Sequence, residues 1–443
     1  MSIFKAYDIR GIYPSEINEE LAYRLGRAFV TFLGCKKVII GKDCRLSTDK
    51  LFDALARGIT DQGADVIDIG LCSSPMLYFA SANHGDAGIM ITASHNPKEY
   101  NGFKLCRENA VPVSGDSGMK DIENLVLKNK FTEAKKGNLS RKDVLDEYTR
   151  HLLKYKGSIH NLKVAVDTAN AMAGVTIPKL LEHINCTVIP LFFKLDGTFP
   201  NHEANPLKHE TLKDLQETVI KEKADLGVAF DGDGDRCGFV DEKGDIISCD
   251  LITALIAEYL LEKKSGQKIL FDVRSSRIVS ETVSKKGGTP VVWKIGHSLI
   301  KEKMKKEKIT FAGEISGHYY FKDGYYAESE GIPLLIIMNI ICEKKKPLSE
   351  LILPFKRYFS SGEINLKVKD KDLVLKKIEE KYEGAEISKL DGISIKYPDW
   401  WFNLRKSNTE PLIRLNLEAK TKDIMEKRRD EVLELIEKTS LPK

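Results

Sequence analysis

Short apolar runs alternate with amphipathic segments along most of the chain, and one order of these elements occurs three times. Each copy has the pattern of a strand, a helix, a second strand, a connection and a third strand that ends in a polar, glycine-bearing loop. Such an internal repeat is typical of a duplicated structural unit. The first strands are KKVIIGKD (36–43), LKVAVDT (162–168) and KILFDVR (268–274). The third strands are GIMI (88–91), LGVAF (226–230) and ITFAG (309–313).

Strands that alternate with helices predict parallel sheets with helices on both faces. Right-handed crossovers then place the carboxyl ends of the strands on one side of each sheet, where ligands bind in open α/β folds. The loops SHNP (94–97), DGDGDR (231–236) and GEISGH (313–318) follow the third strands and are therefore equivalent. We expect them to meet in one shared active site.

The boundaries of the units fall where the pattern restarts. A polar, lysine-rich helical stretch from about 121 to 155 closes the first copy, and an apolar helical stretch that begins near 250 opens the third. From about Arg357 onward the repeat is absent, and strands and helices follow in an α+β order typical of a separately folded lid. The predicted units are 1–150, 151–249, 250–355 and 356–443.

Composition narrows the class of protein. The 443 residues are enough for about three or four domains. The charges nearly cancel at a formal +4, and no block of Lys and Arg interleaved with aromatic residues occurs, so we expect no nucleic-acid partner. The eight cysteines have no metal-ligand spacing and indicate free thiols in a reducing cytoplasm. The longest apolar stretch, LLIIMNIIC (334–342), is about half of a membrane span, so we expect a soluble cytoplasmic protein without a membrane partner.

Three aspartates at alternating positions, Asp231, Asp233 and Asp235, follow a strand directly. Carboxylates at this spacing, separated by glycines, can surround one hard divalent cation such as Mg²⁺. An EF-hand calcium loop has the same beginning, and Glu242 stands at its twelfth position. The sixth position of that loop requires Gly, however, and here it is Arg236, while the flanking segments have the pattern of strands. A catalytic Mg²⁺ site is the favoured interpretation over an EF-hand or a structural turn.

Ser94 is the candidate phosphoryl carrier. A serine next to a histidine is weak evidence for a nucleophile, and no GxSxG elbow supports a hydrolase. Thr92, His95 and Asn96 offer polar groups within one turn, however, and Lys104 follows shortly after. A serine phosphate carries nearly two negative charges, which the metal site and Lys104 would balance. The chain has no Walker A motif, so a nucleoside triphosphate is disfavoured as the phosphoryl donor.

Two further segments have the composition of ligand-binding loops. RKSNTEPLIR (405–414) gathers hydroxyls, an amide and arginines, which are suited to phosphate oxygens, although a polar surface turn would have the same composition. Glu314 and Ser316 would lie on one side of an extended segment and suit adjacent sugar hydroxyls. His318 has the more common interpretation of a structural histidine. His297, at the end of a predicted strand, is the better candidate for proton transfer.

With these motifs in hand, the chain closely resembles the α-D-phosphohexomutases, specifically the phosphomannomutase/phosphoglucomutase branch. Five motifs carry the resemblance in order along nearly the whole chain: AYDIRG (6–11), ITASHNP (91–97) with NGFK after it, DGDGDR (231–236), GEISGH (313–318) and RKSNTEP (405–411). The resemblance implies three related mixed α/β sheet domains and a smaller α+β C-terminal domain around a central cleft.

The resemblance also implies roles for single residues. Ser94 would be the phosphoserine and would bind Mg²⁺ through its phosphate together with the three aspartates. Tyr7 and Arg10 would line the cleft, and Lys104 and Arg236 would lie close to the transferring phosphoryl group. The remaining implied substrate-binding residues are His95 and Arg274, the latter at a position where some relatives carry Lys; Glu314 and Ser316 for the 3- and 4-hydroxyls; and Arg405, Ser407, Asn408 and Thr409 for the phosphate that is not reacting.

The implied activity is reversible phosphoryl transfer between the 1- and 6-positions of a hexose phosphate, with a hexose 1,6-bisphosphate as intermediate and activator. The GEISGH loop is similar to that of hexose-phosphate mutases, whereas phosphoglucosamine mutases usually carry Gln there, which favours mannose and glucose phosphates. A phosphoglucosamine mutase, a metal-dependent sugar phosphatase and a noncatalytic sugar-phosphate-binding protein are the alternatives. We expect a monomer or a weak dimer.

Overall fold

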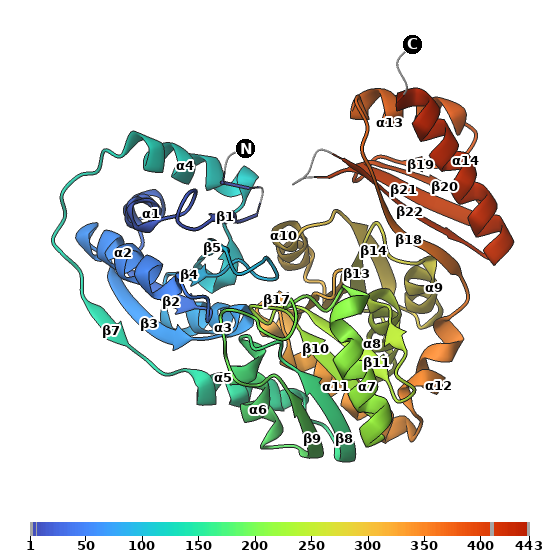
Figure 1. The fold of residues 1–443 in the computed structure, drawn as a ribbon, viewed down its shortest axis with the longest axis horizontal. Helices are drawn as coiled ribbons and strands as arrows, with labels where there is room; N and C mark the ends of the chain where they lie inside the picture. The colour runs from blue at the N-terminus through green and yellow to red at the C-terminus, as the bar shows by residue number, and fades with distance from the viewer. Residues whose placement is uncertain (1–2, 6, 408–411, 441–443) are drawn as a thin grey trace.

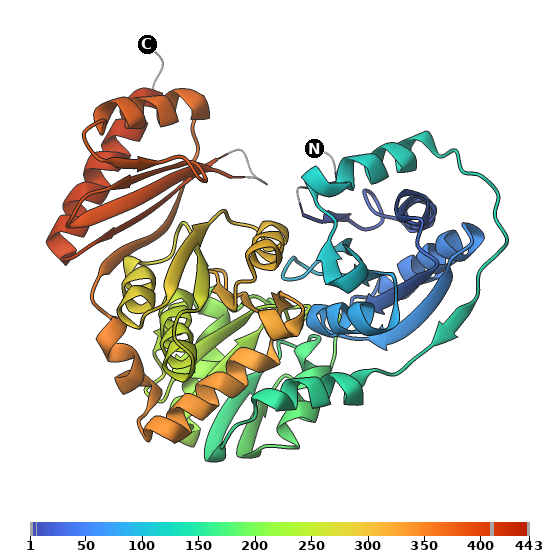
Figure 2. The ribbon, with the colours of Figure 1, turned by 180° about the vertical axis from the view of Figure 1, so that it is seen from behind.

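The computed structural model describes residues 3–5, 7–407 and 412–440. Four sheets follow one another along the chain, and the units built on them are arranged around an arc (Figure 1). The first unit, in blue, and the last, in red, lie at the two ends of this arc, and the view from behind shows the same order (Figure 2). The described structure therefore has the four-unit architecture that the sequence predicts.

The first sheet has the strand order β1-β5-β4-β2-β3-β7, with β6 paired to β5. Its strands are β1 (Ile9–Ile12), β2 (Lys37–Lys42), β3 (Asp65–Leu71), β4 (Ala87–Ile91), β5 (Tyr100–Arg107), β6 (Val111–Pro112) and β7 (Leu139–Arg141). The helices of this unit are α1 (Glu19–Leu33), α2 (Thr48–Asp61), α3 (Ser74–His84), α4 (Met119–Lys128) and α5 (Leu145–Leu152).

The second and third sheets have the orders β12-β11-β10-β8-β9 and β14-β13-β15-β16-β17. The strands of the second are β8 (His160–Asp167), β9 (Asn185–Leu191), β10 (Leu226–Phe230), β11 (Cys237–Asp241) and β12 (Ile246–Ile247), with helices α6 (Ala173–Leu181) and α7 (Lys213–Glu222). The strands of the third are β13 (Lys268–Asp272), β14 (Thr289–Trp293), β15 (Phe311–Gly313), β16 (Tyr319–Phe321) and β17 (Ala327–Glu328). Helices α8 (Cys249–Lys263), α9 (Arg277–Lys285), α10 (His297–Glu307), α11 (Gly331–Lys344) and α12 (Leu348–Ile352) accompany the third sheet.

The predicted repeat is confirmed by the pairing of the strands. In each sheet the first strand of the copy lies between the third and the second and is parallel to both, as β2 does between β4 and β3. The prediction of parallel strands is confirmed for these three strands of each copy but is wrong for the strand that follows them, because the third strand also pairs with an antiparallel strand, namely β5, β11 or β16. The sheets are therefore mixed, as the resemblance implies. A short loop can join only antiparallel neighbours. The three predicted loops are therefore hairpin connections at equivalent edges of the sheets.

The prediction of one helical stretch from about 121 to 155 is also wrong. Helix α4 ends at Lys128, because Asn129 adopts the left-handed conformation that terminates helices, with φ 47°. The chain then forms β7, which extends the first sheet beside β3, before α5 begins.

The fourth unit is an antiparallel sheet covered by two helices. Its strand order is β18-β22-β21-β20-β19. The strands are β18 (Phe359–Leu366), β19 (Glu386–Ser388), β20 (Ile393–Lys396), β21 (Trp400–Lys406) and β22 (Ile413–Ala419), and the helices are α13 (Lys371–Lys381) and α14 (Lys422–Ser440). Both helices contribute to an apolar core that belongs to the fourth unit alone. The first three units instead share one continuous apolar cluster, although the first also has a second core.

Helix α11 explains the longest apolar stretch of the sequence. It is buried from Gly331 to Cys342 and lies inside the shared core, where it contacts α6 and α8. Within the part of the chain that the structure describes, no helix has both the length and the apolar character needed to span a bilayer.

Candidate active site

The loops after β4 and β10 are in direct contact. The Ser94 hydroxyl donates a hydrogen bond of 2.8 Å to Asp231 Oδ2, and both side chains are buried. Ser94 adopts a left-handed backbone conformation, with φ 53°, and its backbone N–H donates to Thr92 Oγ1 at 2.9 Å. A Cβ at Gly232 would lie 2.2 Å from the carbonyl oxygen of Ser94, so only glycine permits this approach. The two loops thus place the candidate nucleophile beside the aspartates.

Arg45, which the sequence analysis missed, holds the loop of Ser94. All five guanidinium donors are used: Nε bonds to Asp43 Oδ2, and the others bond to the carbonyl oxygens of Ser94, Asn96, Pro97 and Tyr100. The Asp43–Arg45 ion pair is fully buried. The only signal in the sequence is a polar run, KDCR, at the carboxyl end of the first strand of the first copy.

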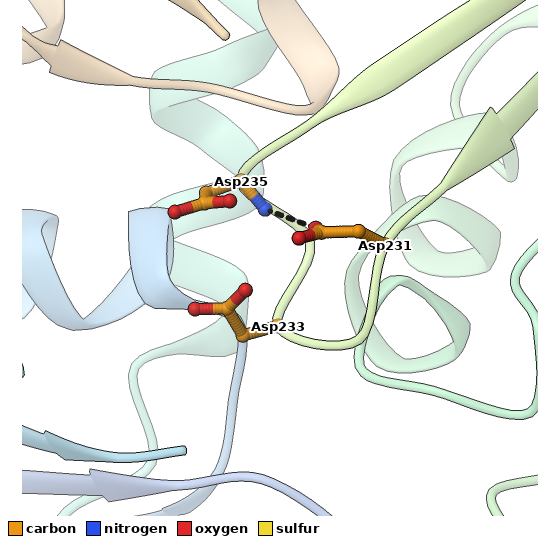
Figure 3. Close-up of side chains that lie close together, drawn as sticks. All are labelled: Asp231, Asp233 and Asp235. Atoms are coloured by element: carbon orange, nitrogen blue, oxygen red, sulfur yellow. Dashed lines mark hydrogen bonds between the residues drawn. The ribbon is translucent and has the colours of Figure 1, made fainter. Parts of the chain in front are cut away.

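The three aspartates converge in the loop between β10 and β11 (Figure 3). One carboxylate oxygen of each lies within 4.8 Å of the others, and all three residues are buried. Asp231 Oδ1 accepts hydrogen bonds from the backbone N–H groups of Asp235 and Arg236. Burial, followed by the charges of Asp235 and Asp233, raises the pKa of Asp231 to about 8. Three carboxylates at this separation need cations close to them.

The aspartate cluster fits a hard divalent cation. Its donors are all oxygens, and among the described residues Asp233 Oδ1 is buried without a hydrogen-bond partner. The EF-hand alternative is excluded, because strands flank the loop and Glu242 bonds instead to the backbone and side chain of Ser349.

Lys104 supplies the nearest protein cation. Its Nζ lies 2.5 Å from Asp233 Oδ2 and 2.5 Å from Asp235 Oδ2. Burial opposes the charged form of Lys104, but the charges of Asp233 and Asp235 outweigh it and raise the lysine pKa. Burial likewise opposes the charged form of Asp235, but Lys104 and His318 hold its pKa well below the ordinary value. Ser74, at the start of α3, also donates to Asp233 Oδ2 and was missed by the sequence analysis.

Arg10 and His95 lie at the same site. Arg10 donates to Asn96 Oδ1 at 2.6 Å and to Asp8 Oδ2 at 2.5 Å. Burial disfavours its charge, but Asp8 and then Asp233 raise the pKa of Arg10. His95 Nδ1 lies 3.1 Å from Ser94 Oγ, and burial together with nearby arginines holds the pKa of His95 well below 6.5, so this imidazole is neutral at pH 7.

His318 connects the aspartates to the loop after β15. Its Nε2 lies 3.3 Å from Asp235 Oδ1, and its Nδ1 lies 3.3 Å from Glu314 Oε2. Burial disfavours the imidazolium, but Asp235 contributes most to a pKa of about 9 for His318. Arg236 Nε lies 3.3 Å from His318 Nε2, so this arginine also lies at the junction.

Glu314 and Ser316 flank His318 on the side of the third sheet. Ser316 Oγ lies 2.8 Å from His318 Nδ1, and Tyr320 donates to Glu314 Oε2 at 2.6 Å. Burial disfavours the Glu314 carboxylate, but its hydrogen bond and charge interaction with His318 lower its pKa to about 2. Glu314 is therefore a fixed anion able to accept hydrogen bonds from hydroxyl groups.

His297 and Tyr7 are neighbours at the first turn of α10. Their rings meet edge to face at 5.7 Å, and Tyr7 donates to the carbonyl of Ile295 at 3.1 Å. Burial, followed by the charges of Lys301 and Lys104, holds the pKa of His297 well below 6.5. His297 is thus neutral and lies within electrostatic reach of the aspartate site.

Arg274 and Arg405 lie where the third and fourth units meet. Arg274 makes a bidentate contact with Asp272 at 3.0 and 2.9 Å, and Asp272 also accepts from the backbone N–H of Ile315 in the loop after β15. Glu363, which the sequence analysis missed, lies 3.7 Å from Arg274 and 3.2 Å from Arg405. Ser407 follows β21, whereas Asn408 and Thr409 lie outside the described residues.

Comparison with known proteins gives the same picture for the whole chain. Four models of phosphoglucomutase/phosphomannomutase domains match in order: α/β/α domain I over 1–133, domain II over 146–244, domain III over 248–358 and the C-terminal domain over 363–435. A phosphomannomutase of Escherichia coli is 42% identical over 452 residues, covering 98% of this chain and 99% of the relative. A phosphomannomutase of Methanocaldococcus jannaschii is 40% identical over 445 residues, covering 99% and 98%.

Solved structures agree with this assignment. A phosphoglucomutase/phosphomannomutase family protein of Burkholderia thailandensis superimposes with a TM-score of 0.92 at 34% identity, covering 99% of this chain and 97% of the other. A phosphoglucomutase of Paramecium, parafusin, has a TM-score of 0.80 at 15% identity, covering 99% and 95%, and shares the fold.

Proposed function

The chain belongs to the phosphoglucomutase/phosphomannomutase family of phosphohexose mutases, and from this premise we propose that it moves a phosphoryl group between the 1- and 6-positions of a hexose by way of phosphorylated Ser94. The observation that carries the proposal is the 2.8 Å contact between Ser94 Oγ and Asp231 within the buried aspartate cluster. A noncatalytic binding protein has no need for a nucleophile at this position.

Asp231, Asp233 and Asp235 would hold Mg²⁺, on which the family generally depends. When bound, Mg²⁺ would stabilise the negative charge that develops on the phosphoryl oxygens beside Ser94. Lys104 already neutralises part of the cluster, and its ammonium would contact the same phosphoryl group. Arg10 and Arg236 would add positive charge on either side of it.

Two transfers make up the cycle. In the first, the bond between Ser94 Oγ and phosphorus breaks while the 6-hydroxyl of a hexose 1-phosphate forms a new bond to phosphorus. The proton of the 6-hydroxyl is transferred in turn to Ser94 Oγ, which becomes a hydroxyl again. The product is a hexose 1,6-bisphosphate, which then reorients in the site so that its 1-phosphate faces Ser94. In the second, the bond between O1 and phosphorus breaks while Ser94 Oγ forms a new bond to phosphorus. The Ser94 hydroxyl proton passes to O1, and a hexose 6-phosphate leaves. The neutral imidazole of His297 is our candidate for moving the hydroxyl proton.

The protein contributes mainly alignment and fixed charge to these steps. Arg45 fixes the carbonyl groups of Ser94 and Asn96, and in the loop held this way the Ser94 hydroxyl points at Asp231. Glu314 and Ser316 would bind the 3- and 4-hydroxyls, with His95 beside the transferring group and Tyr7 on the wall of the site. Arg274, Arg405, Ser407, Asn408 and Thr409 would hold the phosphate that is not reacting.

The fourth unit is suited to close over either phosphate, because its core is separate from that of the other three. Closure would exclude water from the phosphoserine and so limit hydrolysis. We propose that the chain divides into four units that each behave as one body, namely 1–150, 151–249, 250–355 and 356–443. The four separate sheets support this division.

We propose mannose and glucose phosphates as substrates. The names of the relatives in Escherichia coli and Methanocaldococcus jannaschii support mannose. A phosphoglucosamine mutase remains the alternative. The eight free thiols are consistent with action in the cytoplasm, as a monomer or a weak dimer.

Mass spectrometry of the intact protein tests the proposal. After incubation with a hexose 1,6-bisphosphate, a population heavier by one phosphate should appear, with the modification at Ser94. Ser94→Ala should lack both the modification and mutase activity. A modification found only elsewhere would remove the carrier role. Assays of mannose, glucose and glucosamine 1-phosphates, primed with the matching bisphosphate, would rank the sugars. Free phosphate released as fast as the sugar phosphate is consumed would favour a phosphatase.

A further inference from the structure

The carboxylate of Glu363 lies among three arginines, of which we assign Arg274 and Arg405 to the phosphate that is not reacting. Glu363 Oε2 is 3.2 Å from Arg405 Nη2 and 3.7 Å from Arg274 Nη1, while Glu363 Oε1 is 3.4 Å from Arg414 Nη1. Arg405 and Arg414 belong to the fourth unit, and Arg274 belongs to the third. We call Arg274, Arg405 and Arg414 the arginine group.

A β-bulge places Glu363 on this side of the sheet. Ser360 pairs with Glu418 and Glu363 pairs with Asn416, so two residues of β18 oppose the single residue Leu417 of β22. Gly362 allows the bulge with φ 67°, and Ser361 Oγ accepts the hydrogen bond of the Leu417 N–H.

The bulge determines on which face of the sheet the Glu363 carboxylate lies. With regular pairing after Ser360, residue 363 would lie opposite Leu415, whose side chain belongs to the apolar core beneath α13 and α14. A shift of one residue reverses every side chain of a strand. The bulge therefore brings Glu363 onto the polar face that carries Arg405 and Arg414, which pair across β21 and β22.

The contacts of Glu363 differ from those of the second carboxylate nearby. Asp272 binds Arg274 in a bidentate manner at 3.0 and 2.9 Å, which is the geometry of a strong pair. Glu363 makes three longer contacts and is partly exposed to solvent. Burial, followed by the charge of Arg274, lowers the pKa of Arg405, so the positive charges of these arginines lie close enough to oppose one another.

We propose that Glu363 is an internal counter-ion of the arginine group, which a ligand phosphate displaces, and that it keeps phosphate binding weak enough for release. This inference rests on the proposed function, in which a bisphosphate has to leave this site and return with its other end. If the site bound phosphate equally strongly at every step, the bisphosphate would leave and return more slowly. The barrier of the phosphoryl transfer itself would not be lowered. When the phosphate departs, the Glu363 carboxylate would take its place. The arginine group is then never left without an anion.

Calorimetric titration of the full chain with inorganic phosphate tests the inference without any turnover. Glu363→Gln removes the charge at nearly constant shape and should lower the dissociation constant for phosphate about threefold or more. The matched control is Glu386→Gln, which removes a charge from an exposed ion pair of the same unit and should leave the constant unchanged. In an Arg405→Gln background the effect of Glu363→Gln should shrink, because only Arg274 and Arg414 remain beside the carboxylate. Unchanged or weaker binding in Glu363→Gln, or equal tightening in Glu386→Gln, would overturn the inference.

A second variant and a kinetic measurement separate the inference from the proposed function. Glu363→Ser also removes the charge and should tighten phosphate binding if the Gln variant is lost to unfolding. With hexose 1-phosphate as substrate, KM and kcat should both fall in Glu363→Gln, because release becomes slower. Tighter phosphate binding in a protein without mutase activity would refute the mutase and leave the counter-ion role intact. Mutase activity with unaltered KM and phosphate binding would refute the counter-ion role alone.

Discussion

Ser94 Oγ and Asp231 Oδ2 lie 2.8 Å apart although 137 residues separate them in the chain. The hydroxyl belongs to the loop after β4 in the first sheet, and the carboxylate belongs to the loop after β10 in the second. The packing of the first two units therefore builds the site. Small displacements of either loop should affect catalysis before they affect the fold.

Asp231→Asn should abolish the response of the protein to Mg²⁺. In the wild type, Mg²⁺ at about 100 times its dissociation constant should stabilise the fold by about 2.7 kcal/mol, because the cation binds only the folded state. The variant lacks one of the three carboxylate ligands. It also lacks the charge repulsion between residue 231 and the carboxylates of Asp233 and Asp235. Thermal unfolding with increasing Mg²⁺ measures the difference. Asp245→Asn, an exposed position in the same unit, is the control. An undiminished Mg²⁺ response in Asp231→Asn would refute the assignment of this site.

Gly232→Ala should reduce activity while the protein stays folded. The added Cβ would meet the carbonyl oxygen of Ser94 at 2.2 Å, so one of the two loops has to move. A displacement of about 1 Å at a reacting group can lower the rate about 100-fold, and we expect a loss of this size in kcat/KM. At Gly384 the same added atom meets nothing within 4 Å, so Gly384→Ala should have nearly wild-type kinetics. Equal kinetics of the two variants would show that the loops need not touch.

Arg45→Lys should destabilise the first unit despite the unchanged charge. Lysine offers three donors in place of the five that arginine directs at Asp43 and four carbonyl groups. Leaving buried acceptors without partners costs about 1 to 3 kcal/mol each, so we expect a loss of at least about 2 kcal/mol in the free energy of unfolding. Urea denaturation measures it. Arg57→Lys on the exposed side of α2 should change stability by less than about 0.5 kcal/mol, and a similar small change at Arg45 would contradict this role.

The repeat in the sequence was enough to predict three related units and the meeting of their loops, because equivalent strands end at equivalent edges of their sheets. It could not predict the antiparallel strand that follows each loop. β5, for example, is a run of mostly buried residues, and a run without alternation carries no information about strand direction.

The roles of side chains that act through tertiary contacts could not be predicted from the sequence either. The partners of Arg45 include four backbone carbonyls, which have no signature in a sequence. The position of Glu363 depends on a bulge and on arginines of two other segments. By contrast, Ser94 and the three aspartates could be proposed from the sequence because the chemistry requires their residue types and spacing, and the structure brings them together.

His202 should make the stability of the second unit depend on pH. Its Nε2 lies 2.9 Å from Asp167 Oδ2 and its Nδ1 lies 2.8 Å from the carbonyl oxygen of Glu203, so the imidazolium has an acceptor at each nitrogen. Burial alone would lower the pKa of His202, but the hydrogen bond and charge of Asp167 raise it above 6.5.

Because the folded state holds this proton more tightly than the unfolded state, the contribution of His202 to stability should be complete below about pH 6.5. It should be lost as the pH rises through the raised value. His202→Gln should therefore lower the urea midpoint at pH 5.5, and this difference should shrink by pH 8.5. His209→Gln, at an exposed position nearby, should show no such trend. A deficit in His202→Gln that stays constant or grows with pH would mean that the neutral ring is the form the fold requires.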